Sequence, residues 1–154
     1  MAALEWFESI ARLRKRLARL EDAIESAYAA AGPHGQQIGS VGGGGGGDAF
    51  AGIDSIVDTD AVTERDKCKA RLHELMGYAT DVLYGRSGRG GLAKAMTTDD
   101  ADMLCFHYLQ GESWASIGRR FDPDTTNLTV WCKRKAKTTC RTIDRIGMER
   151  LADS

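Results

Sequence analysis

Basic and small polar side chains are concentrated near the carboxyl end of the chain, in an arrangement suited to contacting a nucleic acid. Between positions 133 and 145 there are six basic residues and a single acidic one, Asp144. The basic residues are Lys133, Arg134, Lys135, Lys137, Arg141 and Arg145. Lys and Arg neutralise phosphates, and the Thr and Asn residues that precede them from position 125 can hydrogen-bond to base edges. A solvated basic helix face is the alternative interpretation.

The sequence offers no comparable arrangement for catalysis. Its three histidines, His34, His73 and His107, have no serine, cysteine or carboxylate at a spacing that indicates acid–base or nucleophilic chemistry. The four cysteines contain no C-x-x-C pair, so we expect reduced and mostly packed thiols. A site formed by Cys132, Cys140 and His107 is the remaining metal-binding alternative. We therefore expect no enzymatic activity, no cofactor and no bound metal.

Two short helices are predicted ahead of the basic segment. Thr97 or Thr98 can cap the first, which ends at Gln110-Gly111 because glycine readily takes the left-handed conformation after a helix. Ser113 can cap the second. Its apolar face is expected to consist of Trp114, Ile117, Gly118 and Phe121.

The basic residues belong to a third predicted helix. It should follow Asp122-Pro123-Asp124, with Asp122 or Asp124 as its cap, and end at Gly147. The residues expected to face inward are Leu128, Trp131 or Cys132, Ala136, Cys140 and Ile143. A short helix, a tight turn and a longer helix that becomes basic are typical of a helix-turn-helix. A three-helix bundle with a basic solvent face is the structural alternative.

The segment from His107 to Phe121, HYLQGESWASIGRRF, resembles region 4 of bacterial sigma factors. The usual pattern there is an aromatic and a leucine, then E-G-x-S-[WY]-x-E-I-A-x-x-[LF]. Matches in order and spacing are Tyr108, Gly111, Ser113, Trp114, Ile117 and Phe121. Ser116 and Gly118 stand where the family usually has an acidic residue and alanine. The order of segments along the chain is similar to that of small sigma-like regulators encoded by phages and prophages, including the RinA and ArpU types.

The resemblance implies that the third helix binds promoter-like DNA. Aligning the family's buried valine with Leu128 places four residues at base-reading positions: Thr125, Thr126, Asn127 and Thr129. The residues expected to contact phosphates are Lys133, Arg134, Lys137, Arg141, Arg119 and Arg120. Double-stranded DNA is therefore the expected partner, and host RNA polymerase is a further one that the resemblance suggests.

The N-terminal half is predicted to be a helical hairpin. Apolar or small residues recur at spacings of three and four from Ala3 to Ala31, and a similar pattern runs from Val57 to about Tyr84, which is typical of coiled-coil seams. Ten of the 18 glycines fall within residues 32–52 and predict a flexible loop between the two helices. Because a two-helix core is thin, we expect the hairpin to form a homodimer or to pack on the C-terminal module.

The predicted organisation is therefore all-α, with an antiparallel coiled-coil hairpin at 1–84, a linker at 85–96 and a helix-turn-helix DNA-binding domain at 97–154. The net charge of −1 conceals an uneven distribution, since residues 125–154 contain seven basic and three acidic residues. No stretch reaches the roughly 18 apolar residues that span a bilayer, and the first residues lack a signal-peptide arrangement. We expect a cytoplasmic protein with no membrane contact.

Two functions from different classes fit these features. The first is a sequence-specific DNA-binding transcriptional regulator of phage or prophage origin. The alternative is a DNA-packaging or assembly protein of the small-terminase type, which also combines a helix-turn-helix with coiled-coil helices. Packaging proteins of this type usually place the DNA-binding module first, the reverse of the order predicted here.

Overall fold

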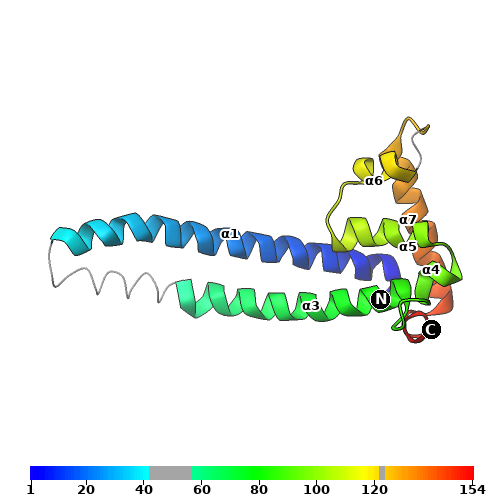
Figure 1. The fold of residues 1–154 in the computed structure, drawn as a ribbon, viewed down its shortest axis with the longest axis horizontal. Coiled ribbons are helices and arrows are strands. Elements are labelled where there is room, and N and C mark those ends of the chain that lie inside the picture. Colours follow the sequence, from blue (N-terminus) through cyan, green and yellow to red (C-terminus); the bar gives the residue numbers. More distant parts are fainter. Residues whose placement is uncertain (42–56, 122–123) are drawn as a thin grey trace. The chain divides into compact units, whose positions relative to one another are not determined.

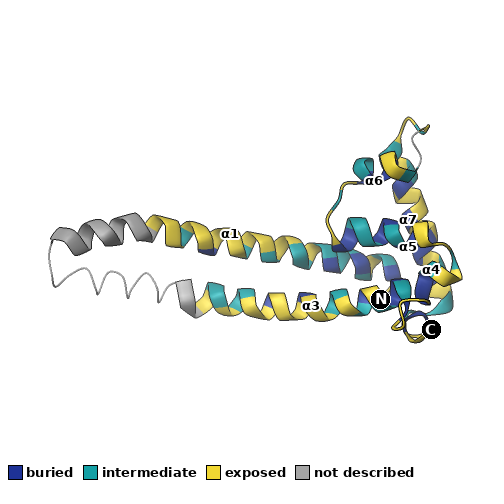
Figure 2. Cartoon of the chain, in the orientation of Figure 1, coloured by how far each residue is buried: buried dark blue, intermediate teal, exposed yellow. Residues whose placement is uncertain are grey.

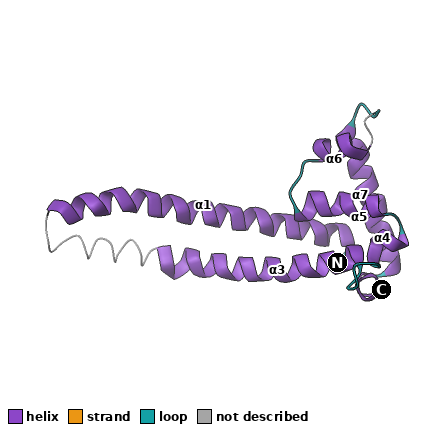
Figure 3. Ribbon diagram, viewed as in Figure 1, coloured by secondary structure: helices purple, strands orange, loops and turns teal. Residues whose placement is uncertain are grey.

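The computed structural model describes residues 1–41, 57–121 and 124–154, and the side chains of 1–30, 60–121 and 124–154. Helices joined by turns make up these residues, and no strand occurs among them (Figures 1 and 3). The all-α fold class is confirmed. By its contacts the chain divides into two compact units: Leu13–Arg71 forms one, and Met1–Arg12 together with Leu72–Ser154 forms the other. None of the described helices is long and apolar enough to cross a membrane.

The unit Leu13–Arg71 contains most of α1 (Ala3–Val41), the π-helical segment η1 (Val57–Val62) and the start of α3 (Thr63–Tyr84). Within this unit α1 and α3 lie side by side (Figure 1). The Cys68 thiol donates to the carbonyl oxygen of Leu13 (3.6 Å), and Arg16 forms an ion pair with Glu64. The two helices therefore run in opposite directions here.

Few seam residues of this unit are fully buried. Exposed and intermediate colours predominate along this part of α1 and α3 in Figure 2. Ile24 and Cys68 are buried, whereas the leucines at 13, 17 and 20 are only half buried. Each helix covers one side of the other, so the remaining sides of these leucines stay open to solvent. The core of this unit is thin, as the sequence predicts.

Helix α1 extends further than predicted. The glycine-rich loop was expected to begin at residue 32, but α1 continues to Val41, so this boundary was wrong. The extension includes a proline at 33 and glycines at 32, 35 and 39, which lower helix propensity, so the sequence pattern alone did not indicate it. The consecutive glycines at 42–47 and the rest of the predicted loop lie outside the described residues.

The other unit contains the C-terminal helices, which pack on one another as a small bundle. They are α4 (Gly91–Ala95), α5 (Thr98–Leu104), η2 (Cys105–Leu109), α6 (Trp114–Phe121), α7 (Leu128–Ile146) and α8 (Met148–Asp153). Helix α7 packs on α5, α6 and α8, and α4 packs on α5 and α8. Thr97 caps α5 by accepting from the Asp100 amide (3.1 Å), as predicted. Gly147 ends α7 with φ +99°, also as predicted.

Residues 85–96, predicted as a linker, are packed into this unit instead. Gly85 and Gly91 have φ of +76° and +65°, so the chain turns sharply and begins α4, in which Leu92 is fully buried. A Cβ on Gly90 would lie 2.5 Å from the carbonyl oxygen of Ser154. The glycines are therefore needed for close packing and tight turning, and they do not provide a flexible spacer.

The first residues of α1 belong to the core of this same unit. Ala3, Phe7 and Ile10 are fully buried. The Ala3 amide donates to Oδ1 of Asp144 on α7 (2.8 Å), and the Phe7 ring lies 5.6 Å from that of Tyr108. Seam residues near the start of α1 thus pack with the C-terminal helices. The division of the chain by contacts differs from the three predicted segments for this reason.

Candidate nucleic-acid interface

Helices α6 and α7 meet through a glycine. A Cβ on Gly118 of α6 would lie 2.7 Å from Cβ of Leu128 and 3.3 Å from Sγ of Cys132, both on α7. The buried Cys132 thiol also donates to the carbonyl oxygen of Trp114 (3.4 Å). Leu128 therefore faces α6, the side that the sequence predicts for it. This contact fixes which side of α7 is left for solvent.

The start of α6 is held by its cap and by an aromatic cluster. Ser113 Oγ accepts from the Ser116 amide (3.2 Å), which confirms the predicted cap. The His107 and Trp114 rings stack with centroids 3.6 Å apart, and Nδ1 of His107 donates to the carbonyl oxygen of Glu112 (2.7 Å). His107 is thus a structural residue at the turn between η2 and α6. Gly111, in the same turn, has φ +84°.

The turn before α7 is longer than predicted. The cap of α7 is Asn127, whose Oδ1 accepts from the Val130 amide (3.3 Å), and not Asp122 or Asp124. Asp124 lies in the preceding turn and is exposed, while Asp122 lies outside the described residues. Leu128, the first residue of α7, packs against Gly118 of α6. We infer that this contact places the start of the helix at Leu128. The position of the cap is therefore set by packing between helices.

The four predicted base-reading residues consequently lie around the start of α7 and not along it. Thr125 and Thr126 precede the helix, Asn127 caps it, and only Thr129 is in its first turn. Thr126 and Asn127 are exposed, whereas Thr125 and Thr129 are half buried. Polar groups at this end of a helix can reach the edges of bases in a major groove.

The basic residues of α7 point away from the core. The buried residues of this helix are Cys132, Ala136, Thr139, Cys140 and Ile143. All six basic residues between 133 and 145 are exposed. Arg134, Lys137 and Arg141 follow one another at spacings of three and four, so they share one side of α7. Thr129, Lys133 and Lys137 follow at spacings of four along the flank of that side.

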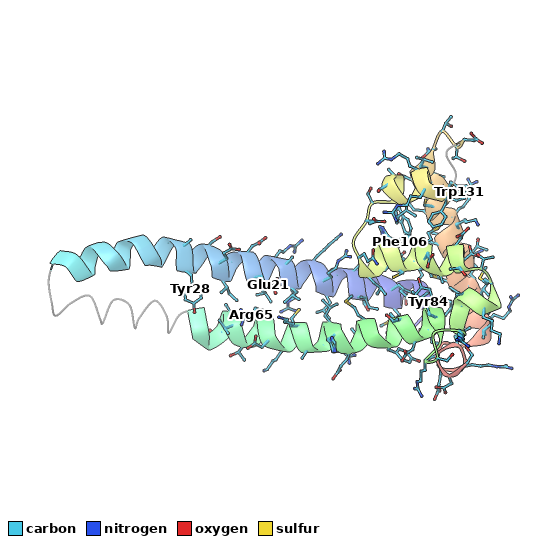
Figure 4. All side chains as sticks on the ribbon, in the orientation of Figure 1. Glu21, Tyr28, Arg65, Tyr84, Phe106 and Trp131 are labelled. Carbon is cyan, nitrogen blue, oxygen red and sulfur yellow. The ribbon has the colours of Figure 1, made fainter. Side chains whose placement is uncertain are left out.

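Ion pairs distinguish the basic residues from one another. Lys135 Nζ lies 3.6 Å from Oδ1 of Asp100 on α5 and 5.6 Å from the centre of the Trp131 ring. Trp131 is labelled in Figure 4. Lys133, Arg134, Lys137 and Arg141 form no salt bridge with another residue that the structure describes. Four of the predicted phosphate contacts therefore carry positive charge that the described part of the chain does not neutralise.

The two arginines predicted to contact phosphates from α6 differ in the same way. Arg119 and Arg120 are both exposed. Arg120 forms an ion pair with Glu112, and its guanidinium lies 4.7 Å from the centre of the Phe106 ring. Phe106 is labelled in Figure 4. Arg119 forms no ion pair among the described residues. The Glu112 carboxylate therefore competes with a phosphate for the Arg120 guanidinium.

Val130 is a surface residue of the site that the sequence analysis overlooked. Its side chain is 44% exposed in the first turn of α7. It precedes Arg134 by four residues and therefore lies on the same side of the helix. The spacing of Val130, Arg134, Lys137 and Arg141 was the signal that could have identified it. An apolar side chain thus stands in line with three basic ones on the solvent-facing side of α7.

The cysteines take no part in this site. All four are free thiols, three of them buried and Cys105 half buried. Burial raises the pKa of Cys140 to about 12, so its thiol stays protonated near neutral pH. The alternative metal site of Cys132, Cys140 and His107 is not formed, because no group of three or more metal-binding side chains occurs in the described part of the chain.

Comparison of the chain with protein-family models, curated proteins and solved structures found no match.

Proposed function

We propose that this protein is a sequence-specific, DNA-binding transcriptional regulator of phage or prophage origin. In this proposal α6 and α7 form a helix-turn-helix, and α7 lies in the major groove of promoter-like DNA. The observation that carries it is the exposed side of α7, where Arg134, Lys137 and Arg141 follow one another with no ion pair to a described residue. The resemblance of residues 107–121 to region 4 of sigma factors supports the same function.

The proposed contacts divide into two groups. Residues around the start of α7 are proposed to bind base edges: Thr125, Thr126, Asn127 and Thr129. Exposed basic residues are proposed to bind phosphates: Lys133, Arg134, Lys137, Arg141, Arg119 and Arg120. Arg120 should contribute least to affinity because its ion pair with Glu112 competes with a phosphate. Host RNA polymerase is proposed as a second partner, recruited to the bound DNA.

The proposal predicts a salt-dependent affinity that depends on α7. Fluorescence anisotropy on promoter-like duplexes at rising salt would measure it for the wild type and for a variant with Lys133, Arg134 and Lys137 changed to Ala. Each lost phosphate contact should lower the slope of log affinity against log salt by about 0.9. The triple variant should therefore lose roughly three units of slope and bind far more weakly at low salt.

A matched variant controls for net charge. Lys67→Ala, Lys69→Ala and Lys94→Ala also remove three exposed positive charges, but from α3 and α4. This variant should keep the wild-type slope. Binding that is insensitive to salt and equal in both triple variants would contradict the proposal, because phosphate contacts necessarily release counterions.

The oligomeric state separates regulation from DNA packaging. The leucines at 13, 17 and 20 are only half buried, and we propose that a second copy covers them in a homodimer. Sedimentation should give a dimer. A ring of eight or more subunits would instead favour the packaging function of small-terminase type.

A further inference from the structure

Val130 has an exposure that neither packing nor helix formation explains. It is one of three large apolar side chains that are exposed in the described part of the chain, together with Met1 and Tyr28. A β-branched residue lowers helix propensity, so a solvent-facing helix position gains nothing from valine. The residue nevertheless stands in the first turn of α7, at the head of the line formed by Arg134, Lys137 and Arg141.

The structure also holds Val130 in a defined position. Its amide donates to Oδ1 of Asn127, the cap of α7 (3.3 Å). Two residues earlier, Leu128 is packed against Gly118 of α6. A β-branched side chain in a helix has one strongly preferred χ1 rotamer, so the two methyl groups of Val130 point in a fixed direction. A rigid apolar group is thus presented beside the polar residues at the start of the helix.

We infer, on the basis of the proposed function, that Val130 contacts the C5-methyl group of a thymine in the bound DNA. Thymine is the one base that carries an apolar group on its major-groove edge. Arg134 lies one turn further along the same side of α7, where it can bind a phosphate that flanks that base. Val130 is therefore a specificity-determining residue that selects thymine over cytosine and over uracil at one base pair.

The test begins by selecting tight-binding duplexes from a randomised pool with the full-length protein. Each selected duplex is then made with thymine and with uracil at single positions, which removes one methyl group at a time. At one position, replacing thymine by uracil should weaken wild-type binding about fourfold. This is the effect expected when the burial of one methyl group is lost. At positions that do not face Val130 the two duplexes should bind equally.

Two variants assign the effect to Val130. Val130→Ala removes the methyl contact and favours the helix, so the variant should fold. It should bind the thymine and uracil duplexes equally at the sensitive position. Thr138→Ala removes another exposed β-branched side chain two turns further along α7. This control should keep the fourfold preference for thymine.

The outcomes distinguish this inference from the proposed function. Salt-dependent binding with no thymine–uracil difference at any position would overturn the inference and leave the regulator proposal intact. A preference that persists unchanged in Val130→Ala would overturn it too, because another group would then contact the methyl. Failure to bind any duplex at low salt would overturn both.

Discussion

At the scale of single residues, the close packing at Gly118 leads to a clear prediction about stability. Alanine usually stabilises a helix relative to glycine by up to about 1 kcal/mol. In α6, however, a new Cβ would lie 2.7 Å from Cβ of Leu128, which cannot swing away as the end of a flexible side chain could. We expect Gly118→Ala to lower the free energy of unfolding by about 1–3 kcal/mol, measured by urea titration of tryptophan fluorescence.

Gly77 provides the matched control for this substitution. It lies in α3, and a Cβ there would meet nothing within 4 Å. Gly77→Ala should therefore raise the free energy of unfolding by up to about 1 kcal/mol. Equal effects of the two substitutions would show that α6 and α7 do not meet at Gly118. The comparison also bears on the proposed function, because the proposed resemblance to region 4 of sigma factors implies alanine at the position of Gly118.

Some individual residues could be predicted from the sequence and others could not. Thr97, Ser113 and Gly147 were identified because a cap depends on its own side chain and on neighbours within one turn. Asn127 was not identified as the cap of α7, because Asp122 and Asp124 are equally good caps by local sequence. The choice among them depends on Leu128 meeting Gly118, a contact between two helices that spacing alone does not reveal.

At the scale of elements, substitution can separate the observed cap at the start of α7 from the base contact proposed for the same residue. Asn127 caps the helix through Oδ1, and its Nδ2 can donate to a base. Asn127→Ala should cost about 1 kcal/mol of stability, whereas Asn127→Ser should restore the cap. Both substitutions should weaken specific DNA binding by roughly tenfold or more, since both remove the amide.

Thermal unfolding and anisotropy on the same selected duplex would measure the cap and the base contact side by side. If Asn127→Ser binds that duplex as tightly as the wild type, Asn127 is a cap and does not contact a base. Asn127→Asp is a useful companion, because it keeps an oxygen for the cap and places a negative charge near the phosphates. We expect it to be as stable as Asn127→Ser and the weakest binder of the three.

Elements with strong local patterns were predicted well, and short packed elements were not. The periodic segments of α1, α3 and α7 and the capped starts of α5 and α6 are predicted, although α1 continues past its predicted end and α7 begins after its predicted cap. The short helices α4 and α8 have too few residues for an apolar period to be visible. Glycine-rich composition at 85–91 suggested a spacer, whereas it serves a tight turn whose partners, Ala152 and Ser154, are distant in sequence.

At the scale of the molecule, the unit that contains α6 and α7 depends on residues from the beginning of the chain. Phe7 is fully buried in that unit against Tyr108. We expect Phe7→Ala to destabilise the unit by about 3–5 kcal/mol. Hydrogen exchange followed by mass spectrometry should then show faster exchange of the α7 amides. Fluorescence anisotropy under the same conditions should show weaker DNA binding.

A substitution elsewhere on the same helix controls for this effect. Leu17 belongs to the unit Leu13–Arg71 and is half buried there. Leu17→Ala should speed exchange chiefly in the first turns of α3. Unchanged exchange in α7 of Phe7→Ala would contradict the expected role of the first residues of α1. Packing of the N-terminal helices on the C-terminal module is one of two arrangements expected from the sequence, but Phe7 is not singled out because it lies off the seam that runs through Ala3 and Ile10.

The joining of Met1–Arg12 to Leu72–Ser154 also sets an order of events during synthesis. The Ala3 amide can donate to Asp144 only after residue 144 has been synthesised. The Gly91 amide can likewise donate to Ser154 only after residue 154 has been added. Leu13–Arg71, by contrast, holds its contacts within one continuous stretch and can assemble while translation continues. The unit proposed to bind DNA therefore completes its core only after residues 148–154 leave the ribosome. A product truncated before residue 148 would carry the unit Leu13–Arg71 but would leave the core of the other unit incomplete.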